Sequence, residues 1–259
     1  MTEELLNVED VEVSFGGVRA VDGVSFALSP GEILGMIGPN GSGKTTLLNA
    51  LTGVVRAKGA VRVADRRVPL GRPEALRRAA LARVYQAPHL IGDLTCLDNV
   101  LLGAADRRAS GLAAAVLGRP LMWRQERART AQAYRHLVRV GLGGRALEPA
   151  SGLPYGEQRL LELARALAAE PRVLMLDEPS AGLNDAETQA LADLLVEIRD
   201  EGAALLVVDH KIDFIDALCD RVLVLELGRR IALGPPAEVW SDQQVMDAYL
   251  GVHRAAGAA

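Results

Sequence analysis

The stretch GPNGSGKT at residues 38–45 has the residue types and spacing of a loop that binds phosphate groups. Its glycines allow backbone N–H groups to turn toward phosphate oxygens. The apolar run EILGMI before the loop indicates a buried strand, and KTTLLNALTGV after it indicates a helix whose N-terminus adds partial positive charge. Lys44 can reach the outer phosphates of a nucleoside triphosphate, and the Thr45 hydroxyl can ligate Mg²⁺. The sequence therefore predicts that a nucleotide is bound by Gly38, Pro39, Asn40, Gly41, Ser42, Gly43, Lys44, Thr45 and Thr46.

Two other apolar runs end in side chains that could act on a bound triphosphate. RVLMLDE ends in Asp177 and Glu178, and ALLVVDH ends in Asp209 and His210. Ligands of a parallel α/β sheet bind at the carboxyl ends of its strands. There Asp177 could hold Mg²⁺ through water or the Thr45 hydroxyl, and Glu178 could act as a base or orient the attacking water. His210 could contact the γ-phosphate. Taken alone, the Asp-Glu pair would more often be a helix cap and the histidine a structural residue.

The composition indicates a globular protein of one or two domains. The chain has 259 residues, of which 49% are apolar and 24% charged, enough for a substantial core. We find no apolar run near the length of a membrane span, and the polar N-terminus is unlike a signal peptide, so we expect a cytosolic chain. Cys96 and Cys219 lack metal-ligand spacing and are interpreted as reduced structural thiols.

The charge is small overall and unevenly distributed. A net charge of −4 argues against general affinity for nucleic acid. Residues 106–145 nevertheless hold nine arginines against only two acidic residues, Asp106 and Glu126. The segment is either a solvated helical face or a basic surface that faces anionic lipid or another acidic partner.

In the order of their motifs, these residues resemble the ATP-binding subunit of ABC transporters over nearly the whole chain. The matching stretches are GPNGSGKT, VYQAP with Gln86, LPYGEQ, VLMLDE, SAGLN and VVDH. The resemblance implies ATP and Mg²⁺ as ligands. It implies that the catalytic residues are Glu178, His210, Gln86 and Lys44, and that the metal ligands are Thr45, Gln86 and Asp177. Phe15 stands where the family places an aromatic that stacks on adenine, although it could instead be a core aromatic of a strand.

The stretch LPYGEQ is the family's signature sequence. An apolar helical face follows it, so the stretch is interpreted as a helix start that attracts anions. In ABC proteins this helix start closes over ATP bound to a partner chain, which implies two ATP sites, each shared between two chains. The residues expected to contact the partner's ATP are Leu153, Pro154, Tyr155, Gly156 and Glu157. Pro154 and Tyr155 replace the commoner Ser and Gly, so we expect backbone N–H groups near Gly156 to carry most of the phosphate contact.

The expected fold is α/β, with a P-loop NTPase core and a mostly parallel sheet. The resemblance adds an N-terminal antiparallel β-subdomain and an inserted α-helical subdomain. In this interpretation residues 1–259 are a single ABC ATPase domain. Residues 1–87 and 166–234 form the core with the antiparallel β-subdomain, residues 88–165 form the helical subdomain ending in the signature, and residues 235–259 form a helical tail.

Softer features resemble one subfamily, the ATPase subunits of branched-chain amino acid importers. They are the tyrosine of PYGEQ, the opening VSFGGVRAVDGVSF, the insert GLAAAVLGRPLMWRQERART, the stretch AGLNDAET and the tail VMDAYLG. The resemblance implies two membrane-spanning permease subunits, a second ATPase subunit in a homo- or heterodimer, and a solute-binding protein acting indirectly. It places the chain in the cytoplasm, peripheral on the inner face of the cell membrane, with no nucleic-acid partner.

The segment that follows Gln86 would contact the membrane partner. Its apolar residues Leu90, Ile91 and Leu94 could form a docking groove, or they could equally belong to the local core. The mechanism implied is that two ATP molecules close the dimer and hydrolysis reopens it.

Other functions remain as alternatives. The chain could serve an ABC system for urea or amides, a lipid, or export, because the transported molecule never touches this subunit. A non-transport ABC ATPase usually has two cassettes in one chain, a long coiled coil or zinc cysteines, none of which we find here. A regulatory module that binds ATP without turnover would lack an equivalent of Glu178 or His210.

Overall fold

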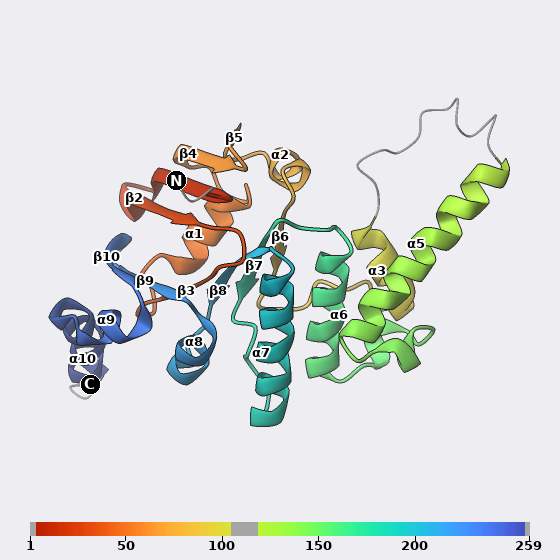
Figure 1. Ribbon diagram of the computed structural model, residues 1–259. Helices are drawn as coiled ribbons and strands as arrows, with labels where there is room; N and C mark the ends of the chain where they lie inside the picture. The colour runs from red at the N-terminus through yellow and green to blue at the C-terminus, as the bar shows by residue number, and fades with distance from the viewer. Residues whose placement is uncertain (1–3, 105–118, 257–259) are drawn as a thin grey trace. The chain divides into compact units, whose positions relative to one another are not determined.

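The computed structural model describes residues 4–104 and 119–256. The chain forms two compact units, one made of Met1–Gln86 with Arg172–Ala259 and the other of Ala87–Pro171. Figure 1 labels most of the helices and strands of both units. None of the helices in the described ranges combines the length and apolar character that a membrane span requires.

The first unit contains two β-sheets. A four-stranded antiparallel sheet has the order β2-β1-β4-β5, formed by β1 (Leu6–Phe15), β2 (Val18–Leu28), β4 (Lys58–Val63) and β5 (Arg66–Val68). A six-stranded sheet has the order β10-β9-β3-β8-β7-β6 and is parallel except at β10. Its strands are β3 (Ile33–Ile37), β6 (Leu81–Val84), β7 (Val173–Asp177), β8 (Ala204–Val208), β9 (Arg221–Glu226) and β10 (Arg229–Gly234). The prediction of an α/β fold with an N-terminal antiparallel sheet and a mostly parallel sheet is confirmed.

Both faces of the parallel sheet are covered. Every residue of β3, β7 and β8 is buried, which explains why these strands are continuous apolar runs and not alternating ones. Residues of α1 and of both sheets, including the strands β8 and β9 beside β3, share one hydrophobic core. The helices of this unit are α1 (Lys44–Leu51), α2 (Pro73–Arg78), α7 (Asp185–Asp200), α8 (Ile212–Leu218), α9 (Pro236–Ser241) and α10 (Gln243–Ala256). The start of α1, and the loop before it, is thereby fixed at the carboxyl end of β3.

The C-terminal tail is helical and packs on the first unit. The indole N–H of Trp240 donates a hydrogen bond of 2.6 Å to Asp216 in α8. The rings of Trp240 and Tyr249 meet edge to face with their centroids 6.0 Å apart. Burial raises the pKa of Tyr249 to about 12. These contacts of Trp240 and Tyr249 tie α9 and α10 to the rest of the first unit.

The second unit is helical. It contains α3 (Cys96–Gly103), α5 (Arg119–Arg139), two short 3₁₀ turns (Gly143–Arg145 and Ala150–Gly152) and α6 (Tyr155–Leu167), and the three α-helices pack against one another. Thr95 caps α3 by accepting a hydrogen bond of 3.0 Å from the backbone N–H of Asp98. The fully buried Asn99 exchanges hydrogen bonds of 2.9 and 3.0 Å with the backbone of Ile91, which ties the preceding loop to α3.

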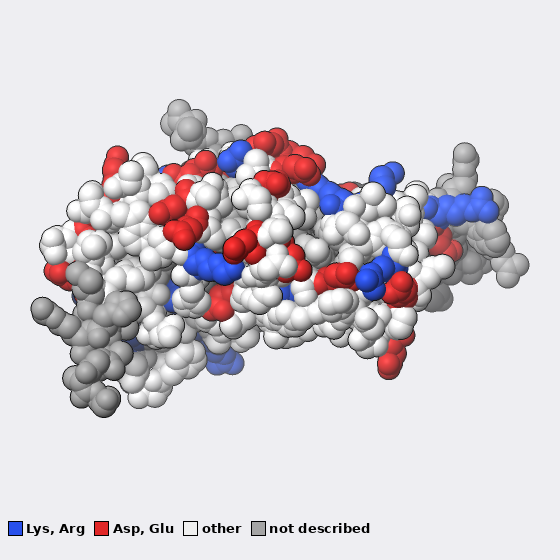
Figure 2. Space-filling model, turned by 90° about the horizontal axis from the view of Figure 1, so that it is seen from below, with Lys and Arg blue, Asp and Glu red and all other residues white. Residues whose placement is uncertain are grey.

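The arginine-rich segment belongs to this unit, and part of it lies outside the described residues. Asp106, Arg107 and Arg108 are in that part, as is the beginning of the insert GLAAAVLGRPLMWRQERART. On the face shown in Figure 2, basic and acidic side chains are interspersed. Whether the segment forms a basic surface therefore stays a prediction.

A close helix contact in the second unit gives a test of its packing. A Cβ added to Gly103 at the end of α3 would fall on the backbone carbonyl oxygen of Arg165 in α6. We expect Gly103→Ala to lower the free energy of unfolding by about 1–3 kcal/mol, because the helices would have to separate. Urea denaturation measures this, with Gly144→Ala as the matched control because its added Cβ meets no atom within 4 Å. Equal stability of the two variants would contradict the close packing of α3 on α6.

Candidate active site

The phosphate-binding loop runs from the end of β3 to the start of α1. Gly43 precedes the helix with φ of 105°, a left-handed conformation in which a Cβ would lie 2.5 Å from the carbonyl oxygen of Ala20. The loop is braced from the β9–β10 turn, where the backbone N–H of Gly228 donates a hydrogen bond of 2.9 Å to Ser42. The conformation of this loop therefore requires glycine at position 43.

Lys44 turns back onto this loop. Its Nζ donates hydrogen bonds of 2.7 Å to the carbonyl oxygen of Gly38 and 3.0 Å to that of Pro39. Lys44 is only 6% exposed. Burial lowers the pKa of its ammonium group, and the nearby carboxylates of Glu178 and Asp177 oppose that shift. A phosphate group would offer this buried cation a charged acceptor in place of two neutral carbonyls.

Glu178 has an unusual backbone conformation at the end of β7. Its φ of 50° lies in the left-handed region, which costs a residue with a side chain about 1 kcal/mol. Its backbone N–H donates a hydrogen bond of 2.7 Å to the carbonyl oxygen of Val208 on the neighbouring strand. Glu178 therefore lies outside the extended backbone of β7, so its side chain does not follow the alternation of the strand.

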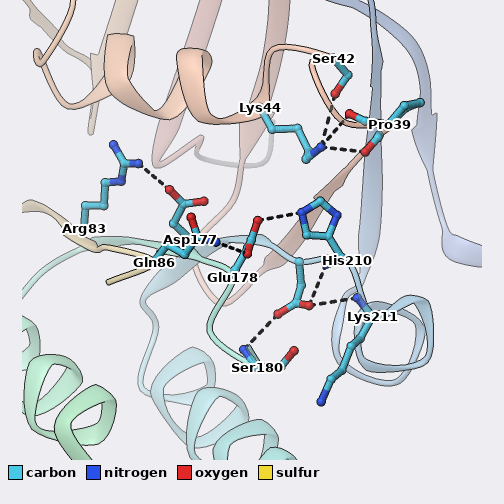
Figure 3. A network of polar contacts seen from close by, with 12 residues as sticks. Pro39, Ser42, Lys44, Arg83, Gln86, Asp177, Glu178, Ser180, His210 and Lys211 are labelled. Atoms are coloured by element: carbon cyan, nitrogen blue, oxygen red, sulfur yellow. Dashed lines mark hydrogen bonds and ion pairs between the residues drawn. The ribbon is translucent and has the colours of Figure 1, made fainter. Parts of the chain in front are cut away.

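Two of the predicted catalytic residues, Gln86 and His210, contact the carboxylate of a third, Glu178 (Figure 3). The Gln86 amide nitrogen donates to Oε2 at 2.6 Å, and Nε2 of His210 lies 2.7 Å from Oε1. These residues follow three adjacent strands of the sheet, β6, β7 and β8, whose carboxyl ends share one edge. Lys44 is close enough for the Glu178 carboxylate to affect its pKa. The structure therefore brings Glu178, Gln86, His210 and Lys44 into one site.

The predicted metal ligands have suitable chemistry for Mg²⁺. The Asp177 carboxylate is 4% exposed at the end of β7, and Thr45 is exposed in the first turn of α1. With the Gln86 amide they provide oxygen donors of three kinds, which a hard cation such as Mg²⁺ prefers. One Asp177 oxygen, Oδ2, lies 2.6 Å from Arg83, a contact that the sequence did not predict.

The remaining predicted residues lie elsewhere. Phe15 is at the end of β1 and is 52% exposed, as a stacking platform requires. The signature residues belong to the second unit, where Pro154 precedes the first turn of α6. There Leu153 is buried, Tyr155 is 48% exposed, and Glu157 forms an ion pair of 3.0 Å with Arg145.

Asp209 is a site residue to which the sequence analysis gave no role. It is 4% exposed, and its carboxylate accepts backbone hydrogen bonds from Ser180 (3.0 Å), His210 (2.7 Å) and Lys211 (3.0 Å). The Lys211 ammonium also lies 3.3 Å from the carbonyl oxygen of Leu183. The turn that carries His210 is therefore fastened to the loop after β7. The available signal was an aspartate at the end of an apolar strand, one residue before the histidine.

Asp209→Ala tests this fastening. The substitution leaves one buried and two partly buried N–H groups without their acceptor, and we expect it to lower the free energy of unfolding by about 2–3 kcal/mol. Asp209→Asn keeps an acceptor oxygen, so its free energy of unfolding should fall by a smaller amount. Asp213→Ala, at an exposed position on α8, is the matched control in urea denaturation. A loss below about 0.5 kcal/mol for Asp209→Ala, the range of ordinary surface changes, would contradict this role.

Comparison with known proteins agrees with the fold. The family model described as "ABC transporter" matches residues 21–181, and one described as "Branched-chain amino acid ATP-binding cassette transporter" matches residues 229–255. Two solved structures resemble the chain with TM-scores of 0.82. One is the ADP conformation of an ATP-binding cassette of an ABC transporter, at 29% identity over 96% of this chain and 99% of that chain. The other is a nucleotide-free ATP-binding cassette, at 28% identity over 95% and 98%.

The chain belongs to the ABC transporter family and has the ATP-binding, ATPase fold of that family. Its curated relatives include the high-affinity branched-chain amino acid transport ATP-binding proteins LivG of Salmonella typhimurium and BraF of Pseudomonas aeruginosa. LivG is 36% identical and BraF 34%, each over 97% of this chain and 99% of the relative. The predicted resemblance to ABC ATP-binding subunits of this subfamily is confirmed.

Proposed function

We propose that this chain is the ATP-hydrolysing subunit of an importer for branched-chain or related amino acids. The observation that carries the proposal is the nearly end-to-end similarity to LivG and BraF. The tail supports the same solute class, because residues 229–255 match a branched-chain model outside the region of the general ABC model.

In the proposed site the loop and α1 bind the phosphates of ATP. Backbone N–H groups of residues 40–46 and the helix N-terminus would face the phosphate oxygens, and Lys44 would exchange its carbonyl acceptors for them. Phe15 would stack on the adenine. Thr45, Asp177 and Gln86 would hold Mg²⁺, which when bound supplies positive charge that stabilises the phosphoryl oxygens in the transition state.

Glu178 is proposed as the base that orients and deprotonates the attacking water. Both of its oxygens are engaged in this structure, one by Gln86 and one by His210. A γ-phosphate would compete with Glu178 for His210, because it is a doubly charged acceptor. Release of His210 toward the phosphate would free one Glu178 oxygen for water, so the base would become available only when the nucleotide is bound.

The helical unit is proposed to serve the partner chains. Its α6 begins at the signature residues 153–157, whose first N–H groups lack intrahelical acceptors and suit the phosphates of ATP on a second ATPase subunit. Ile91, which is 49% exposed, and the half-buried Leu90 and Leu94 are proposed to dock on one of two membrane-spanning permease subunits. A solute-binding protein would act only through those permeases, and the chain would lie on the inner face of the cell membrane.

Replacing Glu178 by Gln tests the proposed chemistry. We expect the ATPase rate of the assembled complex to fall at least a hundredfold, because an amide cannot accept the proton of water, while ATP binding is retained. Rate and bound ATP are both measured on the purified complex. Glu74→Gln, at an exposed position on α2, is the control and should change neither. A Glu178→Gln complex that hydrolyses ATP within threefold of the wild-type rate would remove Glu178 from the base role.

Co-purification from detergent-solubilised host membranes tests the transport function. We expect the tagged chain to retain two multi-span proteins and a second ATPase subunit, identified by mass. Uptake of radiolabelled leucine by host cells should fall when the gene for this chain is deleted and return on complementation. If leucine uptake stays normal in the deletion strain while uptake of urea, an amide or a lipid is lost, the chain would still be a transporter subunit, but its solute would not be a branched-chain amino acid. Retention of nucleic acid without membrane proteins would overturn the transport function.

A further inference from the structure

Arg83 of β6 is buried against the carboxylate of Asp177. Arg83 Nη2 lies 2.6 Å from Asp177 Oδ2, and the two side chains are 4% and 5% exposed. The Arg83 guanidinium carbon lies 4.5 Å from the centre of the Tyr85 ring, which adds a cation–π contact. A buried carboxylate next to the proposed phosphate site is therefore already paired with a fixed cation.

The same guanidinium group also holds the helix that follows the phosphate-binding loop. Its Nη1 donates hydrogen bonds of 2.7 Å to the Asn49 side-chain oxygen and 3.3 Å to the Thr52 hydroxyl, at the C-terminal end of α1. Arg83 thus joins three elements: β6, the end of β7 and α1. The planar fork of an arginine allows these contacts at once, whereas a lysine offers one point charge.

We propose that Arg83 is a positioning residue for the ATPase site, which rests on the function proposed above. It fixes the orientation of the Asp177 carboxylate and the placement of α1 relative to β7. Those two elements carry Asp177 and Thr45, the proposed Mg²⁺ ligands, so their separation depends on Arg83.

Nucleotide binding with and without the metal separates this role from a general structural one. The dissociation constant of ATP is measured for the full chain by equilibrium dialysis, once with Mg²⁺ and once with EDTA. For Arg83→Met we expect the constant for Mg-ATP to rise at least tenfold and that for metal-free ATP to change less than threefold. Arg83→Lys, which keeps the charge, should lie between Arg83→Met and the wild type.

The matched control is Arg221→Met on β9. Arg221 forms an ion pair of 2.8 Å with Glu32, with the two side chains 35% and 11% exposed, so its loss removes a more exposed arginine–carboxylate contact away from the proposed Mg²⁺ ligands. We expect it to leave both constants within twofold of the wild type. If Arg83→Met does not fold, Asn49→Ala combined with Thr52→Val frees the guanidinium from α1 and should shift the Mg-ATP constant in the same direction, at least threefold.

Two results would overturn the role of Arg83. Equal weakening of Mg-ATP and metal-free ATP would mean that Arg83 only maintains the fold, and unchanged binding of Mg-ATP would mean that Asp177 does not need it. Failure of the wild-type chain to bind ATP at all would instead contradict the proposed function.

Discussion

The parallel pairing of β3, β8, β7 and β6 is the constraint on which the site depends. Because these strands run in one direction, the phosphate-binding loop and the polar residues after the other three strands emerge at one edge of the sheet. The complete burial of β3, β7 and β8 protects that arrangement, since a slip of one residue would alter every contact on both faces. Hydrophobic packing thereby decides where the catalytic groups lie.

A second requirement is that acidic groups be held beside the place where a polyanion binds. The three carboxylates at the carboxyl ends of β7 and β8 are each stabilised by different partners. Asp177 is paired with the guanidinium group of Arg83, Glu178 accepts from Gln86 and contacts His210, and Asp209 accepts backbone N–H groups. Arg83, Gln86, His210 and Ser180 each lie on or after a strand next to that of the carboxylate they contact, so the sheet that gathers the carboxylates also supplies groups that keep them in place.

Local patterns in the sequence were sufficient for the strands, the phosphate-binding loop and the residues at the strand ends. They indicated that Lys44, Glu178 and His210 follow apolar runs ending at one edge of the sheet, and the structure brings Glu178 and His210 to 2.7 Å of each other. They could not indicate Arg83, whose partner lies 94 residues further along the chain. The backbone of Glu178 was also unpredictable, since nothing in RVLMLDE requires a left-handed conformation. The role of LPYGEQ depends on a second chain, so it stays a prediction.

The left-handed conformation of Glu178 sets stability against activity at a single position. Glycine, asparagine or aspartate would fit this backbone with less strain than glutamate does. A lineage released from selection for ATP turnover would gain stability by accepting one of these three residues, whereas a β-branched residue would lower the stability further. In the proposed function the strained glutamate is retained because ATP turnover needs its carboxylate, and its replacement in a relative would mark a subunit that binds the nucleotide without hydrolysing it.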